Sequence, residues 1–429
     1  MNTAAGTGAG AIGAADCEPA LLCAVRADDS GLVKRLLLEG SDADVCDVRG
    51  TSAFCLAVGM RSGAIAQLLL MHGADPGLCG PDSLLPLHEA VDSGSLALVD
   101  ALLDTRVRAR YDDSELREVG NLARHWHETG VESELRRRTG ARGAVVRIRV
   151  QDDEFNSVDE YSLGGMTVRD GHAGILTRLE ELLGIHPSFE ELMDRALSHP
   201  DQDHTAWGSS TILLAHRRNR ETWTAAASLR THPDPSHRLF GAEVLRLTHL
   251  FDNSDEDAFA GPALDIFADW SAEEADLDVL TEVLIAVGEH AGPRAEAALL
   301  PHAGHHDARV RRAVARGFST WPSPPAVSDA VHKVLLDLMS DPDAGVRHDA
   351  CLTVADGKDH DPVLTDAMAA LLDDADRRVQ VVAVYGLALH HDERCVEGAR
   401  RLGPPQPAHP GEEHYLGAAW RYEWHRDGR

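Results

Sequence analysis

Residues 47–58 read Asp47-Val48-Arg49-Gly50-Thr51-Ser52-Ala53-Phe54-Cys55-Leu56-Ala57-Val58, and residues 68–75 read Leu68-Leu69-Leu70-Met71-His72-Gly73-Ala74-Asp75. The first segment places polar turn residues and a glycine before a short apolar helix, and the second is a helix that ends at a glycine. Two core positions recur every 33 residues, at Ala24, Ala57, Ala90 and Ala123 and at Leu36, Leu69, Leu102 and Leu135. This period indicates one helical unit repeated, in which each copy buries its apolar face against its neighbours.

The best-preserved copies carry two further marks of the same unit. The third copy has Leu85-Pro86-Leu87-His88 where its first helix begins, and Gly73-Ala74-Asp75 closes the second copy. These segments resemble the TPLH helix start and the GAD-like finger of the ankyrin repeat. The resemblance covers residues 16–140 and about four copies, of which the outer ones are degenerate, as expected of capping repeats whose outer faces meet water.

Partners of ankyrin repeats contact the turn tips and the exposed side of each first helix. The resemblance therefore implies partner-facing positions at Arg49, Thr51, Met60, Asp82, Leu84 and Asp92. Because an inference from fold analogy is associational, plain solvated surface is the alternative for each of these positions.

Residues 141–170 change character. Val146, Ile148 and Val150 alternate with arginines, which is the period of a strand with one face buried. A second apolar-polar alternation, at residues 166–169, follows Gly164-Gly165. We predict a small β hairpin or linker between the ankyrin-like part and the rest of the chain.

From residue 171 to residue 429 the chain reads as successive helices separated by proline, glycine and aspartate. One motif precedes several alanine-rich amphipathic segments, and its best copy is Asp341-Pro342-Asp343-Ala344-Gly345-Val346-Arg347. It resembles the HEAT repeat, a pair of antiparallel helices. In that family the aspartate caps the second helix and the arginine helps to form a ladder between neighbouring repeats. The resemblance therefore implies structural roles for Arg311, Arg347 and Arg378.

The chain of 429 residues carries a net charge of -29. Acidic surface repels phosphate backbones, so we expect no nucleic-acid partner and favour a basic protein or peptide. No stretch approaches 18 uninterrupted apolar residues, so no membrane span is expected. Seven dispersed cysteines without a CxxC pair indicate reduced thiols in a cytoplasmic protein. Residues 1–15, rich in alanine and glycine, predict a disordered tail.

Histidine occurs 24 times, which raises the alternative of a metal site. The densest groups are His302, His305 and His306, and His390-His391 beside Asp392-Glu393. Neither an HExxH motif nor Cys/His finger spacing accompanies them. We therefore predict no catalytic residue, no metal and no cofactor, and keep His302, His305 and His306 as the weaker alternative.

The sequence thus predicts a mainly α protein. An ankyrin-repeat array at residues 16–140 is followed by a small β element at 141–170 and a HEAT-like α-solenoid at 171–429. The favoured function is a non-catalytic scaffold or adaptor that binds a protein or peptide partner on concave repeat surfaces. The alternative is an enzyme or enzyme accessory with a metal or small-molecule site in the HEAT-like groove.

Overall fold

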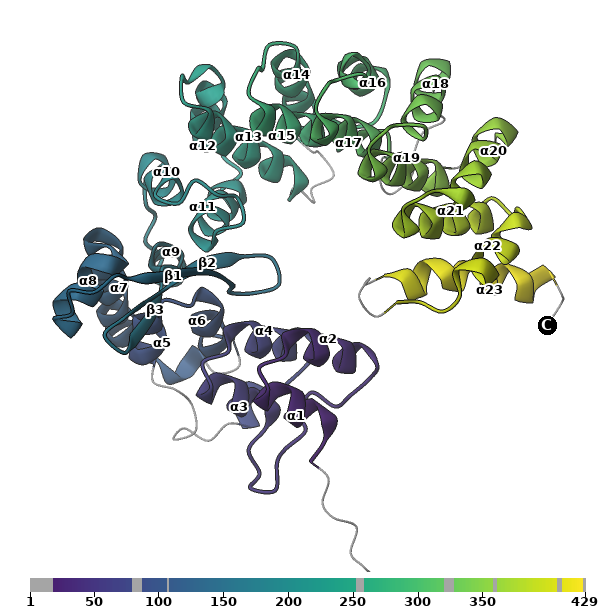
Figure 1. The fold of residues 1–429 in the computed structure, drawn as a ribbon. Helices are drawn as coiled ribbons and strands as arrows, with labels where there is room; N and C mark the ends of the chain where they lie inside the picture. The colour runs from purple at the N-terminus through teal and green to yellow at the C-terminus, as the bar shows by residue number, and fades with distance from the viewer. Residues whose placement is uncertain are drawn as a thin grey trace, which may run out of the picture. The chain divides into compact units, whose positions relative to one another are not determined.

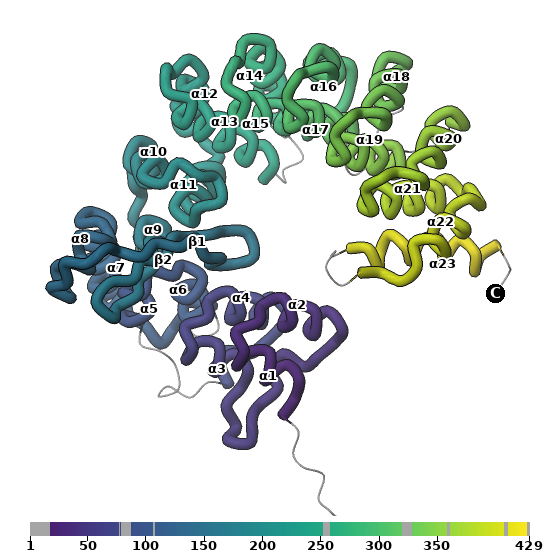
Figure 2. Tube along the Cα trace, in the orientation of Figure 1, coloured from purple at the N-terminus to yellow at the C-terminus, as the bar shows by residue number. Residues whose placement is uncertain are grey.

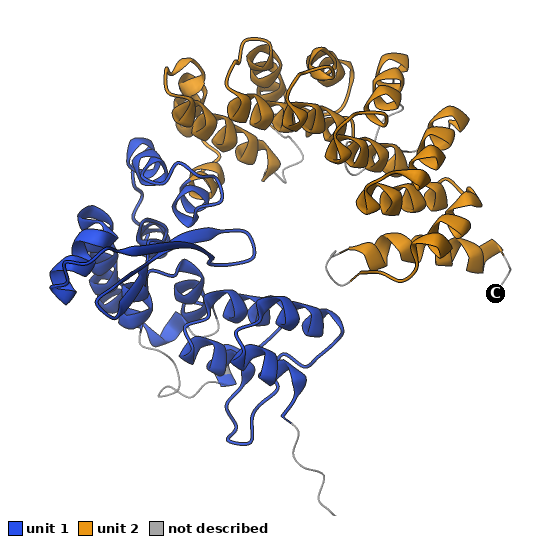
Figure 3. Cartoon of the chain, in the orientation of Figure 1, with its two compact units in different colours: residues 1–210 blue, residues 211–429 orange. Residues whose placement is uncertain are grey.

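The computed structural model describes residues 18–78, 87–105, 108–251, 258–319, 328–357, 361–406 and 411–426. It is mostly helical with a small sheet, which confirms the predicted mainly α fold class. The chain divides into two compact units, residues 1–210 and residues 211–429 (Figure 3). The predicted tail at residues 1–15 lies outside the described residues, and the domain limits inferred from the sequence stay a prediction.

The first unit begins with pairs of short helices. Helices of the same rank in successive pairs pack on one another, α1 on α3 and α2 on α4, so two layers of helices form (Figure 1). The helices of this part are α1 (Ala20–Arg26), α2 (Ser30–Leu38), α3 (Ala53–Gly59), α4 (Gly63–Met71), α5 (Leu87–Ser93), α6 (Leu96–Leu102), α7 (Asp113–Thr129) and α8 (Val131–Thr139).

The 33-residue period is a period of burial. Ala24, Ala57, Ala90 and Ala123 are at most 1% exposed, so the first helices of neighbouring repeats approach closely across small side chains. Leu69, Leu102 and Leu135 are fully buried, whereas Leu36 is partly buried at the edge of the array. Full burial of one leucine contributes about 1.5 to 3 kcal/mol, so the repeated positions hold the repeats together.

Three antiparallel strands follow, in the order β1 (Val146–Gln151), β2 (Ser157–Leu163) and β3 (Met166–Arg169). The predicted hairpin is therefore part of a three-stranded sheet. The expectation for its faces is wrong, because Val146 and Ile148 are 59% and 51% exposed. The arginine side of β1 lies instead on the face where Tyr161 and Leu163 of β2 contact the helices, and Arg147 pairs with Asp159.

The sheet is tied to the repeats by a buried carboxylate. Asp152, directly after β1, accepts hydrogen bonds from the Ser95 hydroxyl at 2.6 Å and the Ala97 backbone N–H at 3.0 Å. Both donors lie at the start of α6, where a carboxylate is favoured by unpaired N–H groups and by the helix dipole. Three helices complete the first unit: α9 (His172–Leu182), α10 (Phe189–Leu197) and the first half of α11 (Thr205–His216). The rest of α11 belongs to the second unit.

The second unit is a row of helical hairpins in two layers. One layer contains α13, α15, α17, α19, α21 and α23, each packed on the next, and the helices between them form the other layer (Figure 2). Their bounds are α12 (Arg220–Ser228), α13 (Pro235–Leu250), α14 (Ala260–Ser271), α15 (Leu277–Gly288), α16 (Pro293–Leu299), α17 (Ala308–Gly317), α18 (Asp329–Leu338), α19 (Ala344–Asp356), α20 (Pro362–Ala370), α21 (Arg377–Leu389), α22 (Arg394–Leu402) and α23 (Glu412–Arg426).

The recurring aspartate of this unit caps the helices of the first layer. Asp234, Asp307, Asp343 and Asp376 each accept a backbone N–H from the first turn of α13, α17, α19 and α21. Such caps satisfy N–H groups that have no partner within the helix.

The recurring arginines form a ladder. Arg311 reaches both carboxylate oxygens of Asp341 at 2.7 Å, and Arg347 reaches both oxygens of Asp374 at 2.7 and 2.8 Å. Each arginine also donates to two backbone carbonyls at the start of its own motif, so it joins two successive hairpins. Arg238 repeats the arrangement with Glu274.

Arg378 departs from its expected place in the ladder. Its side chain is 62% exposed and pairs with the neighbouring Asp376. The residue after Val379 is Gln380, which donates to the Asp374 carbonyl, and Arg377 instead reaches Glu412 of α23. The motif therefore keeps its cap in this copy, but the contact to the next helix comes from the first residue of α21.

Cys55 is disulfide-bonded, so the expectation of reduced thiols is wrong at this position. Cys23, Cys46, Cys351 and Cys395 form no disulfide. In the part of the chain that the structure describes, no helix combines the length and the apolar character needed to cross a bilayer.

Candidate functional site

The first finger of the ankyrin array is shaped by Asp47. Its Oδ1 atom accepts the backbone N–H groups of Arg49 at 2.8 Å and Thr51 at 2.9 Å, and Gly50 takes the positive φ of +81° that the turn requires. These N–H groups lower the pKa of Asp47, and the guanidinium of Arg26, 2.9 Å from Oδ2, lowers it further. The conformation of the tip is therefore fixed by hydrogen bonds within the chain.

A cleft of about 780 Å³ opens beside this finger. Its walls include Glu18, Arg26, Asp47, Val48, Arg49 and Thr51. Val48 at the tip is 92% exposed. The cleft thus combines an exposed apolar tip with charged groups of both signs.

The other positions inferred from the ankyrin pattern are placed differently. Met60 is 43% exposed at the end of α3 and does not line the cleft. Asp82 and Leu84 lie outside the described residues. Asp92 accepts the indole N–H of Trp126 at 2.9 Å and the guanidinium of Arg138 at 2.7 Å. The structure therefore brings Arg49 and Thr51 together, and gives Asp92 partners within the chain.

Asp92 belongs to a charged network beneath the sheet. Arg138 lies over the Trp126 ring, 4.4 Å from its centroid, and also donates to the fully buried Glu134 at 2.8 Å. Hydrogen bonds from Arg137 lower the pKa of Glu134 to about 2, although burial opposes this, and bonds from Arg138 and His125 act in the same direction. The network fixes α7 and α8 against each other.

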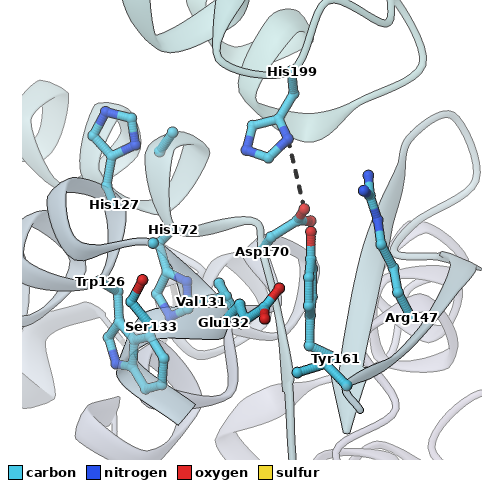
Figure 4. A pocket seen from close by; sticks show the side chains of 13 residues that line it. Trp126, His127, Val131, Glu132, Ser133, Arg147, Tyr161, Asp170, His172 and His199 are labelled. Carbon is cyan, nitrogen blue, oxygen red and sulfur yellow. Dashed lines mark ion pairs between the residues drawn. The ribbon is translucent and has the colours of Figure 1, made fainter. Parts of the chain in front are cut away.

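A second cavity, of about 450 Å³, lies between this network and the sheet (Figure 4). We call it the histidine pocket. It is lined by His127, His172 and His199, by the carboxylates of Glu132 and Asp170, and by Trp126, Ser133, Arg147 and Tyr161. Its wall therefore carries several groups able to donate, accept or coordinate.

Asp170 stands where three segments meet. Its Oδ1 atom accepts the backbone N–H of Asp159 at 2.8 Å and lies 3.0 Å from Nε2 of His204. Its Oδ2 atom lies 3.6 Å from Nδ1 of His199. Burial would raise the pKa of Asp170, but the hydrogen bond to His204 and the nearby His199 hold it below the usual value. Asp170 is therefore a buried carboxylate anion.

The two histidines beside it are stacked, with ring centroids 4.0 Å apart and planes 7° from parallel. Burial lowers the pKa of His199 to about 4, and His204 contributes to the same shift. A neutral His199 ring avoids the repulsion of two stacked cations. Neutral imidazole is also the form of histidine that coordinates metal ions.

His172 forms another part of the wall. It is 1% exposed and stacks on Trp126 at 4.9 Å, and burial lowers its pKa to about 3. The backbone of Val91 approaches the ring, but among the described residues neither ring nitrogen has a partner with full hydrogen-bond geometry. Such unsatisfied buried nitrogens are uncommon and call for water or a ligand in the adjoining space.

Glycines bring this wall close to the ankyrin array. The Gly171 N–H donates to the Gly94 carbonyl at 3.0 Å. A Cβ atom on Gly94 would lie 1.9 Å from the Arg169 carbonyl oxygen, and its φ of +75° disfavours other residues. The turn that carries Asp170 and His172 is therefore clamped directly against the third repeat.

The histidines singled out from the sequence do not assemble in this way. His305 accepts the Asp307 backbone N–H at 3.1 Å and contacts His306, and burial lowers the pKa of His302. Over the described ranges, the one group of three metal-ligand side chains is Asp170, His199 and His204. This group was not singled out from the sequence. Its local sign in the sequence is the pair His199 and His204, five residues apart, whereas Asp170 comes from a distant segment.

Comparison with known proteins assigns part of the chain. Residues 21–113 match the ankyrin-repeat family in three copies. Among solved structures, the Escherichia coli protein YibA is 16% identical and has a TM-score of 0.40, with 55% of this chain and 93% of YibA covered. An engineered protein is also 16% identical, with a TM-score of 0.27 and 55% and 96% covered. At these scores neither structure supports a conclusion, and the comparison with curated proteins gives no match.

Proposed function

We propose that this protein is a non-catalytic interaction protein that binds a protein or peptide partner through the first finger of its ankyrin repeats. Ankyrin repeats generally mediate protein–protein interaction, and residues 21–113 match that family. The observation that carries the proposal is the finger itself, where a turn organised by Asp47 presents Val48 and Arg49 beside a cleft.

The chemistry of the cleft indicates how a partner binds. Covering Val48 would remove apolar surface from water, which is favourable by about 25 cal/mol for each Å². Arg49 and Glu18 line the same cleft, so their charged side chains can form hydrogen bonds or ion pairs with polar groups of the partner. Because the turn is already ordered by its own hydrogen bonds, little conformational entropy is lost on binding.

The second unit contributes in two ways in this proposal. Its capped hairpins and arginine ladder support the resemblance to HEAT repeats, and we infer a second binding surface there. The net charge of -29 favours a basic partner by steering its approach. Linking two binding surfaces in one chain raises the overall affinity through effective concentration. The proposal places the protein in the cytoplasm: four cysteines of the described ranges form no disulfide, whereas Cys55 is disulfide-bonded.

The test is an affinity purification with quantitative mass spectrometry on the full chain and two variants. Val48→Asp combined with Arg49→Glu changes the finger tip without touching the core, since both side chains are exposed. Leu38→Asp is the matched control, because Leu38 is an exposed apolar residue, 70% exposed, on α2 in the other helix layer.

We expect a partner that is retained by the full chain and by the control but lost with the finger variant. Equal retention by all three chains would contradict a role for the finger. Retention of no protein by any of them would contradict the proposed function itself.

A further inference from the structure

We propose that Asp170, His199 and His204 form a binding site for a divalent first-row transition metal ion of the zinc type. This site is independent of the proposed protein binding at the first finger. It lies in the wall of the histidine pocket, where Asp170 follows β3, His199 follows α10 and His204 precedes α11.

The donor set suits such an ion. Two imidazole nitrogens, which are borderline donors, and one carboxylate oxygen form a set that Zn²⁺ binds, whereas hard ions such as Mg²⁺ prefer oxygen donors alone. The three ligand atoms all lie within 4.8 Å of one another. His204 Nε2 is 3.0 Å from one oxygen of Asp170, and His199 Nδ1 is 3.6 Å from the other. In a zinc site all three atoms lie about 2.0 to 2.2 Å from a common centre. Coordination therefore requires the stacked rings of His199 and His204 to turn toward that centre.

An independent observation points to a ligand at this place. Oδ2 of Asp170 is buried and has no hydrogen-bond partner among the described residues, although the side chain is only 4% exposed. A buried carboxylate oxygen without a partner carries a desolvation cost that a cation would remove. His199, 3.6 Å from this oxygen, presents its Nδ1 atom from the opposite segment (Figure 4).

The pocket supplies the remaining coordination position. Asp170 and His199 line the cavity of about 450 Å³, whereas His204 does not line it. An ion held by these three side chains would therefore keep one side open to the pocket. Three protein ligands with an open fourth position are the arrangement of zinc sites that bind water or a substrate, whereas structural zinc sites are closed by four protein ligands.

The backbone around the ligands is well fixed. The Asp170 N–H donates to the Asp159 carbonyl at 3.0 Å, which continues the sheet up to the site. The Ser157 N–H donates to the Asp203 carbonyl at 2.7 Å, which anchors the segment before His204 to β2. Rigid elements on both sides keep the two flanking ligands in place, as a metal site requires.

Two hydrogen bonds of His204 oppose the ion. Nδ1 of His204 accepts the Ala206 backbone N–H at 3.1 Å, so in the neutral ring the proton resides on Nε2 and points to Asp170. Coordination through Nε2 moves this proton to Nδ1, and both the bond from Ala206 and the bond to Asp170 are then lost. The loss of these two hydrogen bonds is set against three coordinate bonds to a divalent ion.

Zinc titration of the full chain tests the proposal. The protein is stripped with a chelator, exchanged into metal-free buffer and titrated with Zn²⁺ against a chromophoric competitor, and Co²⁺ spectra then report the ligand geometry. His199→Ala and Asp170→Asn remove one ligand each. His186→Ala is the matched control, because His186 is an exposed histidine of the same unit, in the loop between α9 and α10.

We expect one equivalent of Zn²⁺ to bind the full chain and the His186→Ala control alike. In His199→Ala the affinity should fall on the order of 100-fold or more, since even supporting residues of metal sites cost 10- to 100-fold. Zn²⁺ should also raise the melting temperature of the full chain but not that of His199→Ala, which separates loss of the site from loss of the fold. The proposal is overturned if the full chain binds no Zn²⁺ above the competitor, or if His199→Ala binds it as tightly as the full chain.

Discussion

Replacing Arg347 by alanine should break the ladder between α19 and α21. The guanidinium makes two bonds to Asp374 and two to the carbonyls of Asp341 and Pro342, at 2.7 to 3.1 Å. Both side chains are largely buried, at 16% and 7% exposed. Removing one partner of a fully buried pair costs about 3 to 5 kcal/mol, because the other charge is left without its partner.

Two facts reduce that figure for Arg347. The pair keeps some contact with water, and Asp374 retains the Asp376 backbone N–H at 2.8 Å. We therefore expect a loss of about 2 to 3 kcal/mol in the free energy of unfolding of this region. Arg347→Lys keeps the charge but loses the planar fork, so its effect should lie between that of alanine and no change.

Hydrogen exchange measured by mass spectrometry is the assay, because it reports on peptides of α19 and α21 separately from the rest of the chain. A loss of about 2 to 3 kcal/mol corresponds to exchange that is roughly 30- to 150-fold faster. Arg378→Ala is the matched control: its side chain is 62% exposed, and surface pairs contribute about 0 to 1 kcal/mol. If Arg347→Ala exchanges no faster than Arg378→Ala, the ladder does not hold the hairpins together.

The remaining predictions concern a carboxylate, a helix crossing and a turn. The pKa of Glu134 is about 2 against an ordinary value of 4.5, so its charge stabilises the fold above pH 4.5, and the contribution disappears as the pH falls towards 2. Near neutral pH, Glu134→Gln should therefore lower the free energy of unfolding by about 1 to 3 kcal/mol, seen as a lower urea midpoint. Near pH 2 its stability should differ little from that of the unchanged chain. The exposed Glu132→Gln should change little at either pH, and a pH-independent effect of Glu134→Gln would refute the assignment. Gly288→Ala should destabilise the second unit by about 1 to 3 kcal/mol, because its Cβ would lie 2.5 Å from Gly317 Cα where α15 crosses α17. Gly261→Ala, with open space around it, should not destabilise the unit. Equal melting temperatures of the two variants would refute the close contact between α15 and α17. Asp47→Ala should free the finger turn and speed exchange of the Arg49 and Thr51 amides, whereas Asp42→Ala, outside this turn, should leave them unchanged; unchanged exchange in Asp47→Ala would show that the side chain does not order the tip.

Much of the fold could be predicted because its determinants are local and periodic. The alanine and leucine positions 33 residues apart define the buried side of each ankyrin helix, and the matched family confirms the repeats over residues 21–113. The aspartate caps were also readable, since a cap is a contact between residues two or three positions apart.

The errors arise where a neighbour in space decides the outcome. The alternation in β1 predicted a strand, but which face is buried depends on α7 and α8, and they cover the side of Tyr161 and Leu163. Arg378 has the expected aspartate beside it, yet the position that reaches the next hairpin in this copy is taken by Arg377. The repeat period does not show which of two neighbouring arginines makes the contact to the next hairpin.

The two candidate sites differ in the same respect. Arg49 and Thr51 could be named as candidates because they lie in one turn whose family pattern is known, and their role in binding stays a prediction. Asp170 and His199 are brought together by the sheet, the glycine contact with the third repeat and the path of α10, none of which is visible in a local pattern. The histidine clusters that are dense in the sequence, by contrast, do not form a group of three metal-ligand side chains within the described residues.

Protein binding by the ankyrin finger is the central claim, and its most direct test is an affinity measurement between purified proteins. The partner recovered with the full chain is titrated against the full chain, against Val48→Asp combined with Arg49→Glu, and against Leu38→Asp. We expect an affinity at least on the order of tenfold weaker for the finger variant, since a few contact residues carry most of an interface's binding energy. The affinity of the control should be unchanged. Equal affinity of all three chains would contradict the central claim.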